Sequence, residues 1–478
     1  MKSLDNRTLI EASTAVATPR YDRSSLKPGI VHLGLGAFHR AHQAVFTDRA
    51  IEHSGGDWGI VGISLRSDRV AHQLNPQDGL YSVLSEDQYG QELRVIGAIQ
   101  RVLVAPETPG ELDELLVDPA IRVVTLTVTE KGYCLGEDGW SLDRSLPQVL
   151  QDMAHPQRAS TAIGVLARGM AQRYHRNGAP ISIISCDNLG KNSARLRSVL
   201  LQYLEATFPE VIPWLQSEVA FPCSMVDRIV PAMTGAGLDR QAALIGLRDE
   251  GAVATEPFSQ WIIEDKFAAA APNWSAVGVQ LVRDIRPYEE VKLRLLNASH
   301  SVIAITGLLS GKETVADVMA EPALARYITE LMSDELIPAL DAPPGYDLTH
   351  YRDQLLARFS NPCLQHRCAQ IATDSTEKIR QRWLKTLQGQ SGDTRLLRAL
   401  ALWCYLVLDT DLVINDPRAK VLMALRSGKG DLTVRLNSVL ECVGIAPGQN
   451  ELEESRLKLL VRFVSETALE PLALLRNR

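Results

Sequence analysis

The segment IVHLGLGAFHRAHQAVF, residues 30–46, indicates how the N-terminal half of the chain folds. A four-residue segment, Ile30–Leu33, that is apolar except for His32 runs directly into Gly34-Leu35-Gly36, and a helix-compatible segment follows. This order is typical of a dinucleotide-binding fold, in which the first glycine makes the tight turn and the second lets the backbone approach a pyrophosphate at a helix N-terminus. His39 occupies the place of the third glycine of that pattern. From the pattern alone, cofactor binding and an ordinary strand–turn–helix therefore both remain open.

An acidic residue follows the second predicted strand. The apolar segment 58–65 leads into Arg66-Ser67-Asp68, where the ribose-binding carboxylate of a βαβ unit stands. A carboxylate there accepts hydrogen bonds from the ribose hydroxyls and repels a 2′-phosphate, which favours NAD over NADP. Arg66 could equally bind the phosphate of NADP, and a surface ion pair of Arg66 with Asp68 is the third interpretation.

Short β-branched runs alternate with helical stretches over residues 1–284, which is typical of an α/β domain with a parallel sheet. The predicted strands are Ile30–Leu33, Trp58–Leu65, Val123–Val128, Ile181–Ser185 and Val277–Val282. The predicted helices are Ala41–Ser54, Thr108–Leu116, Thr161–Arg176 and Ser193–Thr207. Two alternating runs around Gln88-Tyr89-Gly90 predict an antiparallel hairpin, over residues 81–100, that is inserted in the sheet.

The strand pattern stops near Asp284, and apolar residues then recur at three- and four-residue spacing. The predicted helices are Tyr288–Leu309, Pro322–Leu336, Thr349–Phe359, Thr394–Leu408, Ala419–Arg426, Leu432–Val443 and Leu452–Leu474. The sequence therefore predicts two domains, an α/β domain at residues 1–284 and an all-helical domain at residues 285–478.

Composition narrows the class of protein and its compartment. The 478 residues carry a formal net charge of −7 and are 45% hydrophobic, which is typical of a globular protein and excludes a disordered chain. The mild acidity argues against a nucleic-acid partner. Seven widely spaced cysteines indicate a reducing compartment. The N-terminus lacks the apolar segment of a signal peptide, and the longest apolar run, residues 399–408, is about half of what spans a bilayer. We therefore expect a cytoplasmic protein without a membrane partner.

A second motif lies in the segment PYEEVKLRLLNASH, residues 287–300. On a regular helix with Lys292 at zero, Glu289 would lie at about 60°, His300 at about 80° and Asn297 at about 140°. Oxidation of a secondary alcohol by hydride transfer needs a base, and a lysine can serve if burial lowers its pKa. Asn297 and His300 could donate to the same oxygen atom. A solvated polar stripe on a surface helix is the alternative interpretation, and no ligand set with metal spacing is visible.

Seven blocks of sequence carry a resemblance to a known family. They are GLGAFHRAHQA at 34–44, LTVTEKGYC at 126–134, SCDNL at 185–189, FPCSMVDRIVP at 221–231, EPFSQWIIEDKF at 256–267, KLRLLNASH at 292–300 and RFSNP at 358–362. With these blocks the chain resembles the polyol-specific long-chain dehydrogenase/reductase (mannitol dehydrogenase) family, which includes mannitol 2-dehydrogenases and fructuronate reductases. The lysine, asparagine and histidine spacing at residues 292–300 is highly specific to that family.

The resemblance implies a Rossmann-type N-terminal domain, an all-helical C-terminal domain and a metal-free site between them that uses NAD. It implies that Lys292 is the general acid/base, that Asn297 and His300 polarise the carbonyl, and that Glu289 exchanges protons with solvent. The cofactor-binding residues implied by the matching blocks are Gly34, Gly36, Phe38, His39, Arg40, Asp68, Glu130 and Asn188. The substrate-binding residues are Asn188, Asp227 and Lys378, to which the chemistry of an acidic substrate adds Arg367.

The segment LQHRCAQIATDSTEKIRQR, residues 364–382, looks closer to the fructuronate reductases, because the mannitol branch would have an arginine where Gln370 stands. The carboxylate of a hexuronate needs a cationic partner. Arg367 or Lys378 could supply it, and a purely structural role for Arg367 is equally open. We expect the locally positive charge at Lys292, Arg40 and Lys378, and also at Arg367 if this residue binds the carboxylate.

The leading hypothesis is an NAD-dependent oxidoreductase that interconverts D-fructuronate and D-mannonate by metal-free hydride transfer. The alternative within the class is a mannitol or arabinitol 2-dehydrogenase that acts on neutral polyols and ketoses. A catalytically retired NAD-binding sensor is the hypothesis from another class. The expected partner is therefore a small sugar acid or polyol, and the sequence leaves the oligomeric state open.

Overall fold

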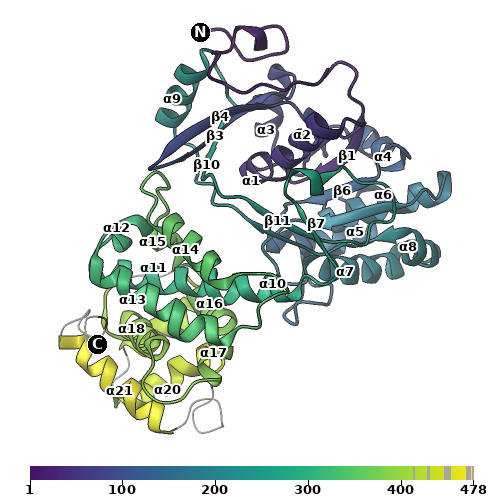
Figure 1. The fold of residues 1–478 in the computed structure, drawn as a ribbon. Coiled ribbons are helices and arrows are strands. Elements are labelled where there is room, and N and C mark those ends of the chain that lie inside the picture. Colours follow the sequence, from purple (N-terminus) through teal and green to yellow (C-terminus); the bar gives the residue numbers. More distant parts are fainter. Residues whose placement is uncertain (413–414, 428–430, 446–453, 470–474, 476–478) are drawn as a thin grey trace. The chain divides into compact units, whose positions relative to one another are not determined.

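The strand that leads into the glycine turn, β1 (Pro28–Leu33), lies at the centre of a six-stranded sheet in this computed structural model (Figure 1). The strand order is β5-β2-β1-β6-β7-β8, and all neighbouring pairs are parallel. The other strands are β2 (Gly59–Ser64), β5 (Ile99–Val104), β6 (Val123–Leu126), β7 (Ile181–Ser185) and β8 (Val219–Ala220). In this doubly wound order the strand sequence reverses between β1 and β6, which is where such folds bind ligands. The predicted Rossmann-type architecture is confirmed.

The parallel strands bury both of their faces. Successive side chains of a strand point to opposite sides of the sheet, so a strand such as β1 contributes to two apolar cores. On β1, Val31 and Leu33 contribute to one apolar core and Ile30 to the other. The first core is completed by α4 (Pro109–Val117), α6 (Ala162–Arg176), α7 (Asn192–Thr207) and α8 (Ile212–Glu218). The second core includes α2 (Gln43–Ser54) and α3 (Arg69–Leu74). The remaining helices of this part are α1 (Ala37–Ala41), α5 (Pro147–Ala154) and α9 (Gly235–Ile245).

The predicted hairpin is present, but it lies in a sheet of its own. β3 (Tyr81–Asp87) and β4 (Gly90–Ile96) pair antiparallel, and β10 (Val253–Thr255) extends them on the β3 side. The expectation that the hairpin is inserted in the main sheet is therefore wrong. It is the segment directly after the hairpin, β5, that joins the main sheet beside β2.

A third sheet has the order β12-β11-β9 and was only partly predicted. Its strands are β9 (Ser224–Asp227), β11 (Gln260–Glu264) and β12 (Gln280–Val282). The predicted strand Val277–Val282 is shorter than expected, because Trp274–Val277 forms a 3₁₀ turn.

The second part of the chain is built of helices, as predicted. They are α10 (Arg286–Val291), α11 (Ala298–Ser310), α12 (Val315–Met319), α13 (Pro322–Glu330), α14 (Leu348–Phe359), α15 (Cys368–Ile371), α16 (Ser375–Arg382), α17 (Leu384–Gln388), α18 (Arg395–Asp409), α19 (Ala419–Ser427), α20 (Leu432–Cys442) and α21 (Glu454–Leu469). Two π-helical turns, η7 (Lys292–Asn297) and η8 (Leu331–Leu336), interrupt segments that were expected to be regular. The helices α12, α15, α16 and α17 were not predicted.

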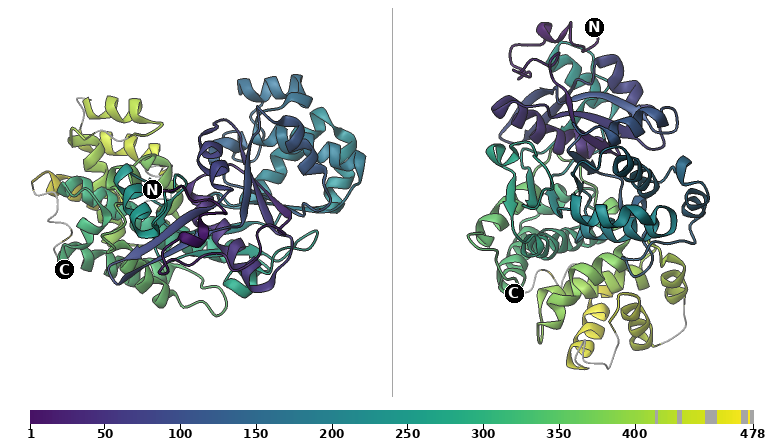
Figure 2. Two further views of the ribbon diagram at one scale, coloured as in Figure 1. Left: turned by 90° about the horizontal axis from the view of Figure 1, so that it is seen from above. Right: turned by 90° about the vertical axis from the view of Figure 1, so that its right-hand side faces the viewer.

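The structure describes residues 1–412, 415–427, 431–445, 454–469 and 475. These divide into two units, Met1–Ile285 and Arg286–Arg478, which Figure 2 shows from two further directions. The predicted helix Leu452–Leu474 extends at both ends outside the described residues. None of the described helices is long and apolar enough to cross a membrane.

Candidate active site

The glycine turn after β1 has the backbone conformation that its two glycines permit. Gly34 has a φ of +88°, and a Cβ atom there would lie 2.3 Å from the Thr127 carbonyl oxygen. Gly36 is exposed and precedes α1, and the nearest atom to a Cβ atom there would be the Gly34 oxygen at 3.8 Å. The space in front of Gly36 is therefore open, which fits the close approach of a pyrophosphate to the backbone.

The residue in the place of the third glycine packs inside the protein. The His39 ring stacks on His32 of β1 with 3.4 Å between centroids. His32 is held between the hydroxyls of Thr125 and Thr127, at 2.7 and 2.9 Å. Burial, and then the neighbouring His32, His42 and Arg40, hold the pKa of His39 well below its usual range. The predicted cofactor residue His39 thus lies beneath the turn as a neutral ring that joins helix and strand.

Two other predicted cofactor residues flank the turn. Phe38 is half-buried and stacks on His42 at 5.1 Å between ring centroids. Arg40 is buried, and its guanidinium donates to the carbonyl oxygens of Gly36 at 3.3 Å and Gly251 at 2.6 Å. The positive charge expected at Arg40 therefore lies against backbone carbonyls, one of which belongs to the turn itself.

Asp68 lies where the ribose-binding carboxylate was predicted. It precedes α3, a few residues beyond the carboxyl end of β2, and its side chain is 54% exposed. Its Oδ2 lies 3.1 Å from Nε2 of His72. Because β2 pairs with β1 in parallel, the acid and the glycine turn lie at the same edge of the sheet.

Glu130 and Asn188 follow β6 and β7, at that same edge, and both are exposed. Between them lies Asp187, which sequence reasoning did not single out. Its carboxylate accepts from the backbone N–H groups of Val128 (2.9 Å) and Thr129 (3.0 Å) and from the Tyr133 hydroxyl (2.6 Å). Thr129, next to Glu130, has a φ of +65°, a conformation that β-branched residues rarely adopt. Asp187 therefore shapes the loop that carries Glu130.

The candidate catalytic motif lies on a helix that changes its winding. Lys292 and Asn297 are the first and last residues of the π-turn η7, and His300 lies in the first turn of α11. The expected 140° between Lys292 and Asn297 is therefore wrong, because it assumed a regular α-helix. In a π-helix the backbone bond joins residues i and i+5, so these two side chains lie on nearly the same face.

The rest of the motif follows from ordinary helix geometry. His300 is three residues after Asn297, a spacing that also places two side chains on one face. Lys292 and His300 are 9% and 7% exposed, and Glu289 is half-buried on α10, one turn before the lysine. The structure thus brings Lys292, Asn297 and His300 to one side of the same helix, and excludes the solvated-stripe interpretation.

Cationic residues surround His300. Its ring lies 4.8 Å from that of Phe359 and 4.9 Å from that of His366, between centroids. Its Nε2 is buried without a hydrogen-bond partner among the described residues. Burial holds the pKa of His300 well below its usual range, and the charges of His366, Arg382, Arg358 and Lys378 lower it further. The imidazole is therefore neutral at physiological pH, and its ring nitrogen is available for a ligand oxygen.

The predicted substrate residues lie in different surroundings. Lys378 on α16 belongs to the cationic set around His300, and its Nζ donates to the Ile371 carbonyl at 3.0 Å. Arg367 lies at the surface and pairs with Glu313 at 3.3 Å, with both side chains 67% exposed. Asp227 is buried at the end of β9 in the first unit.

Three residues near His300 were missed by sequence reasoning. They are Arg358, His366 and Arg382. Arg358 stands inside the quoted block RFSNP, and Arg382 is four residues after Lys378, a spacing that places two side chains on one helix face. Those two signals could have found the arginines.

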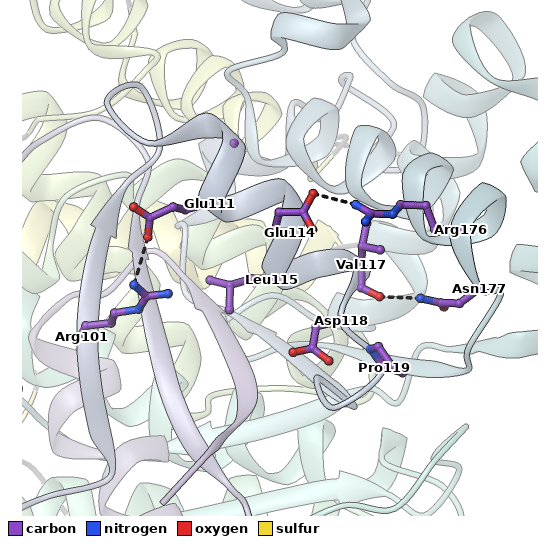
Figure 3. A pocket seen from close by; sticks show the side chains of 10 residues that line it. Arg101, Glu111, Glu114, Leu115, Val117, Asp118, Pro119, Arg176 and Asn177 are labelled. Carbon is purple, nitrogen blue, oxygen red and sulfur yellow. Dashed lines mark hydrogen bonds and ion pairs between the residues drawn. The ribbon is translucent and has the colours of Figure 1, made fainter. Parts of the chain in front are cut away.

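The first unit also has a surface pocket of about 700 Å³ beside α4 (Figure 3). Four of its five charged side chains form ion pairs, Arg101 with Glu111 at 3.0 Å and Arg176 with Glu114 at 2.6 Å, and the fifth is Asp118. None of the predicted site residues is among those that line it, so we do not connect it with the reaction.

Within the described part of the chain, no group of three His, Cys, Asp or Glu residues is placed to hold a metal ion.

Comparisons with known proteins give the family. Residues 28–276 match the model of the mannitol dehydrogenase Rossmann domain, and residues 284–435 match that of the mannitol dehydrogenase C-terminal domain. D-mannonate oxidoreductase of Escherichia coli is 41% identical over 382 residues, which cover 79% of this chain and 78% of that protein. Polyol:NADP oxidoreductase of Gluconobacter oxydans is 37% identical over 80% of each chain.

A solved structure agrees with this result. Mannitol 2-dehydrogenase of Pseudomonas fluorescens, in a ternary complex with NAD and D-mannitol, matches with a TM-score of 0.84 and 34% identity, over 98% of this chain and 97% of that one. The chain therefore belongs to the mannitol dehydrogenase family and is an oxidoreductase.

Proposed function

We propose that the protein interconverts D-fructuronate and D-mannonate with NAD as the cofactor, with Lys292 as the general acid/base of a metal-free hydride transfer. The observation that carries the proposal is the placement of Lys292, Asn297 and His300 on one face of a helix whose surroundings hold Arg358, Lys378 and Arg382. The identity to D-mannonate oxidoreductase supports the same substrate.

The residues of the motif divide the proton chemistry among themselves. During oxidation Lys292 takes the proton of the substrate hydroxyl, and during reduction it returns a proton to the carbonyl oxygen. The Asn297 amide and the neutral His300 ring donate to that oxygen and stabilise the charge that develops on it. Glu289, three residues before Lys292, then exchanges the proton with solvent.

NAD accepts or supplies the hydride when it is bound. The backbone at Gly34 and Gly36 would hold its pyrophosphate and Asp68 its ribose. Glu130 and Asn188 lie at the carboxyl edge of the sheet where the nicotinamide end of a dinucleotide is bound in such folds.

The seven cysteines are all free thiols, which supports action in the cytoplasm.

An acidic substrate explains the charge around His300. A carboxylate is bound most strongly by arginine and lysine in a buried site. Arg358 now replaces Arg367 as the proposed partner beside Lys378, because Arg367 is exposed and already paired with Glu313.

A neutral polyol is the second candidate substrate. The mannitol 2-dehydrogenase structure matches almost the whole chain, and Lys292, Asn297 and His300 would act in the same way on a ketose. For such an enzyme we expect the cationic residues around His300 to give an acidic substrate no advantage over a neutral one.

Oxidation of NADH with D-fructuronate and with D-fructose, measured side by side, tests the substrate. We expect kcat/KM to favour fructuronate by about 10²-fold or more, since hydrogen bonds to charged groups contribute roughly 1.5–3 kcal/mol each. A preference for fructose would establish the polyol alternative and leave the catalytic residues unchanged.

Replacement of Asp68 by serine tests the cofactor. The variant should raise the KM for NADH by about tenfold, because it loses bonds to the ribose, and it should lower the KM for NADPH, because no carboxylate repels the 2′-phosphate. Asp57→Ser, at the opposite end of β2, is the matched control and should change neither value. Equal use of NADH and NADPH by the unaltered protein would contradict the assignment of NAD.

A further inference from the structure

The segment 382–386 contacts the π-turn η7 at both of its ends. Near the start of the turn, Nε and Nη2 of Arg294 donate to the Thr386 hydroxyl at 3.0 and 2.8 Å. At its end, Nη1 of Arg382 donates to the Asn297 carbonyl at 3.2 Å, and Nε1 of Trp383 donates to the Ala298 carbonyl at 3.1 Å. We call the pair Arg382 and Trp383 the clamp.

The clamp binds where the winding of the helix changes. Asn297 is the last residue of the π-turn and Ala298 is the first of α11. The ladder of backbone bonds changes its spacing at this junction, so its carbonyls benefit most from additional donors. Arg382 also donates to the Ser301 hydroxyl at 2.8 Å, and that hydroxyl donates to the Asn297 carbonyl at 3.1 Å.

The winding matters because of the spacing of the catalytic residues. Lys292 and Asn297 are five residues apart, which would place them about 140° apart on an α-helix. Only the π-turn brings both side chains to one face. An alternative α-helical winding would need no change in sequence, so the π-turn requires contacts that favour it from outside the helix.

We propose that Arg382 and Trp383 are positioning residues, which hold the π-turn so that Asn297 and Lys292 act on the same substrate oxygen. The proposal rests on the proposed function, because it assigns the clamp a role through those catalytic residues. Trp383 is fully buried, and its indole N–H has its bond within the helix junction, so a role in direct contact with substrate is not assigned to it.

Single variants separate the hydrogen bond from packing and charge. Trp383→Phe removes the indole N–H and keeps an aromatic ring. Arg382→Met removes the donors, and Arg382→Lys keeps the charge and one donor. Trp403→Phe is the matched control, because Trp403 is also fully buried and donates to Ser375 at 3.1 Å, away from the π-turn.

The kinetic measurement is kcat and KM with NADH and the better of D-fructuronate and D-fructose. We expect Trp383→Phe and Arg382→Met to lower kcat by about 10–100-fold, as for small displacements of catalytic groups, with KM changed by less than about threefold. Arg382→Lys should recover part of the loss, and Trp403→Phe should leave kcat within about twofold. A raised KM for fructuronate alone with unchanged kcat would show that Arg382 contacts the carboxylate, and would overturn the positioning role.

Hydrogen exchange of the apo protein gives a readout without substrate or cofactor. The backbone amides of residues 297–302 should exchange faster in Trp383→Phe and Arg382→Met than in the unaltered protein and in Trp403→Phe. Unchanged exchange together with unchanged kcat in folded variants would overturn the proposal. If the unaltered protein reduces neither sugar, the proposed function fails, whereas the exchange data still decide whether the clamp holds the turn.

Discussion

Replacement of Lys292 by alanine is expected to lower kcat by about 10²–10⁴-fold, the range that a positioned acid–base group contributes. Lys292 is buried at the start of the π-turn, on the face it shares with Asn297. With the amine removed, the substrate hydroxyl has no base and the carbonyl oxygen has no proton donor. The measurement is the initial rate of NADH oxidation or formation, with the melting temperature as the check on folding.

A second substitution distinguishes proton transfer from charge. Lys292→Arg keeps a cation, but a guanidinium cannot lose its proton near neutral pH, so this variant should be as impaired as the alanine variant. A small primary amine added to the Lys292→Ala variant should restore part of its rate. Lys312→Ala is the control, because Lys312 lies beyond α11 and pairs with Glu321. Unchanged turnover in Lys292→Ala would sink the mechanism, because another group would then have to serve as the acid/base.

Four strands of the parallel sheet were predictable, β1, β2, β6 and β7, because they are buried on both faces and their sequences are mostly apolar. β5 was missed for the opposite reason. It lies at the edge of the sheet, where Arg101 is exposed and interrupts the run, and it follows the hairpin without a clear turn signal. The two-residue strand β8 was too short to be recognised. The hairpin was recognised from local alternation, but the sheet it joins depends on β10, more than 150 residues later in the sequence.

The helix α16 was missed because most of its surface is polar. Its sequence is STEKIRQR, and Ile379 is its only buried apolar side chain, so it shows no apolar periodicity. This helix carries Lys378 and Arg382, and with it the cationic surroundings of His300. The family resemblance could therefore identify Lys378, but the local sequence pattern could not identify the helix that carries it.

The candidate catalytic residues could be chosen from the sequence, but their geometry could not be predicted from it. Chemistry and spacing singled out Lys292, Asn297 and His300, but the angles assumed a regular helix. A π-turn depends on donors from elsewhere in the chain, here Arg382 and Trp383, and a single segment does not contain that information. Arg367 was selected for its charge alone, and in the structure it forms a β-bridge with residue 314 while its side chain is exposed and paired with Glu313.

Replacement of Gly34 by alanine should damage both the stability of the first unit and the binding of NADH. Alanine at a φ of +88° costs about 1–2 kcal/mol. The new Cβ atom would also lie 2.3 Å from the Thr127 carbonyl oxygen, so β1 or β6 must move. We expect the melting temperature to fall by at least about 4 °C and the KM for NADH to rise by about 10²-fold, since the turn itself is displaced.

Gly36→Ala separates these two effects. Gly36 has a φ of −96°, which alanine adopts readily, and a Cβ atom there would have no neighbour closer than 3.8 Å. The melting temperature should therefore change by less than about 2 °C, while the methyl group occupies the space through which a pyrophosphate approaches the backbone. Thermal melting and NADH fluorescence titration, measured on both variants, check the expectation. If Gly36→Ala bound NADH with unchanged affinity, the pyrophosphate would not lie against this turn, and the assignment of Gly34 and Gly36 to the cofactor would be wrong.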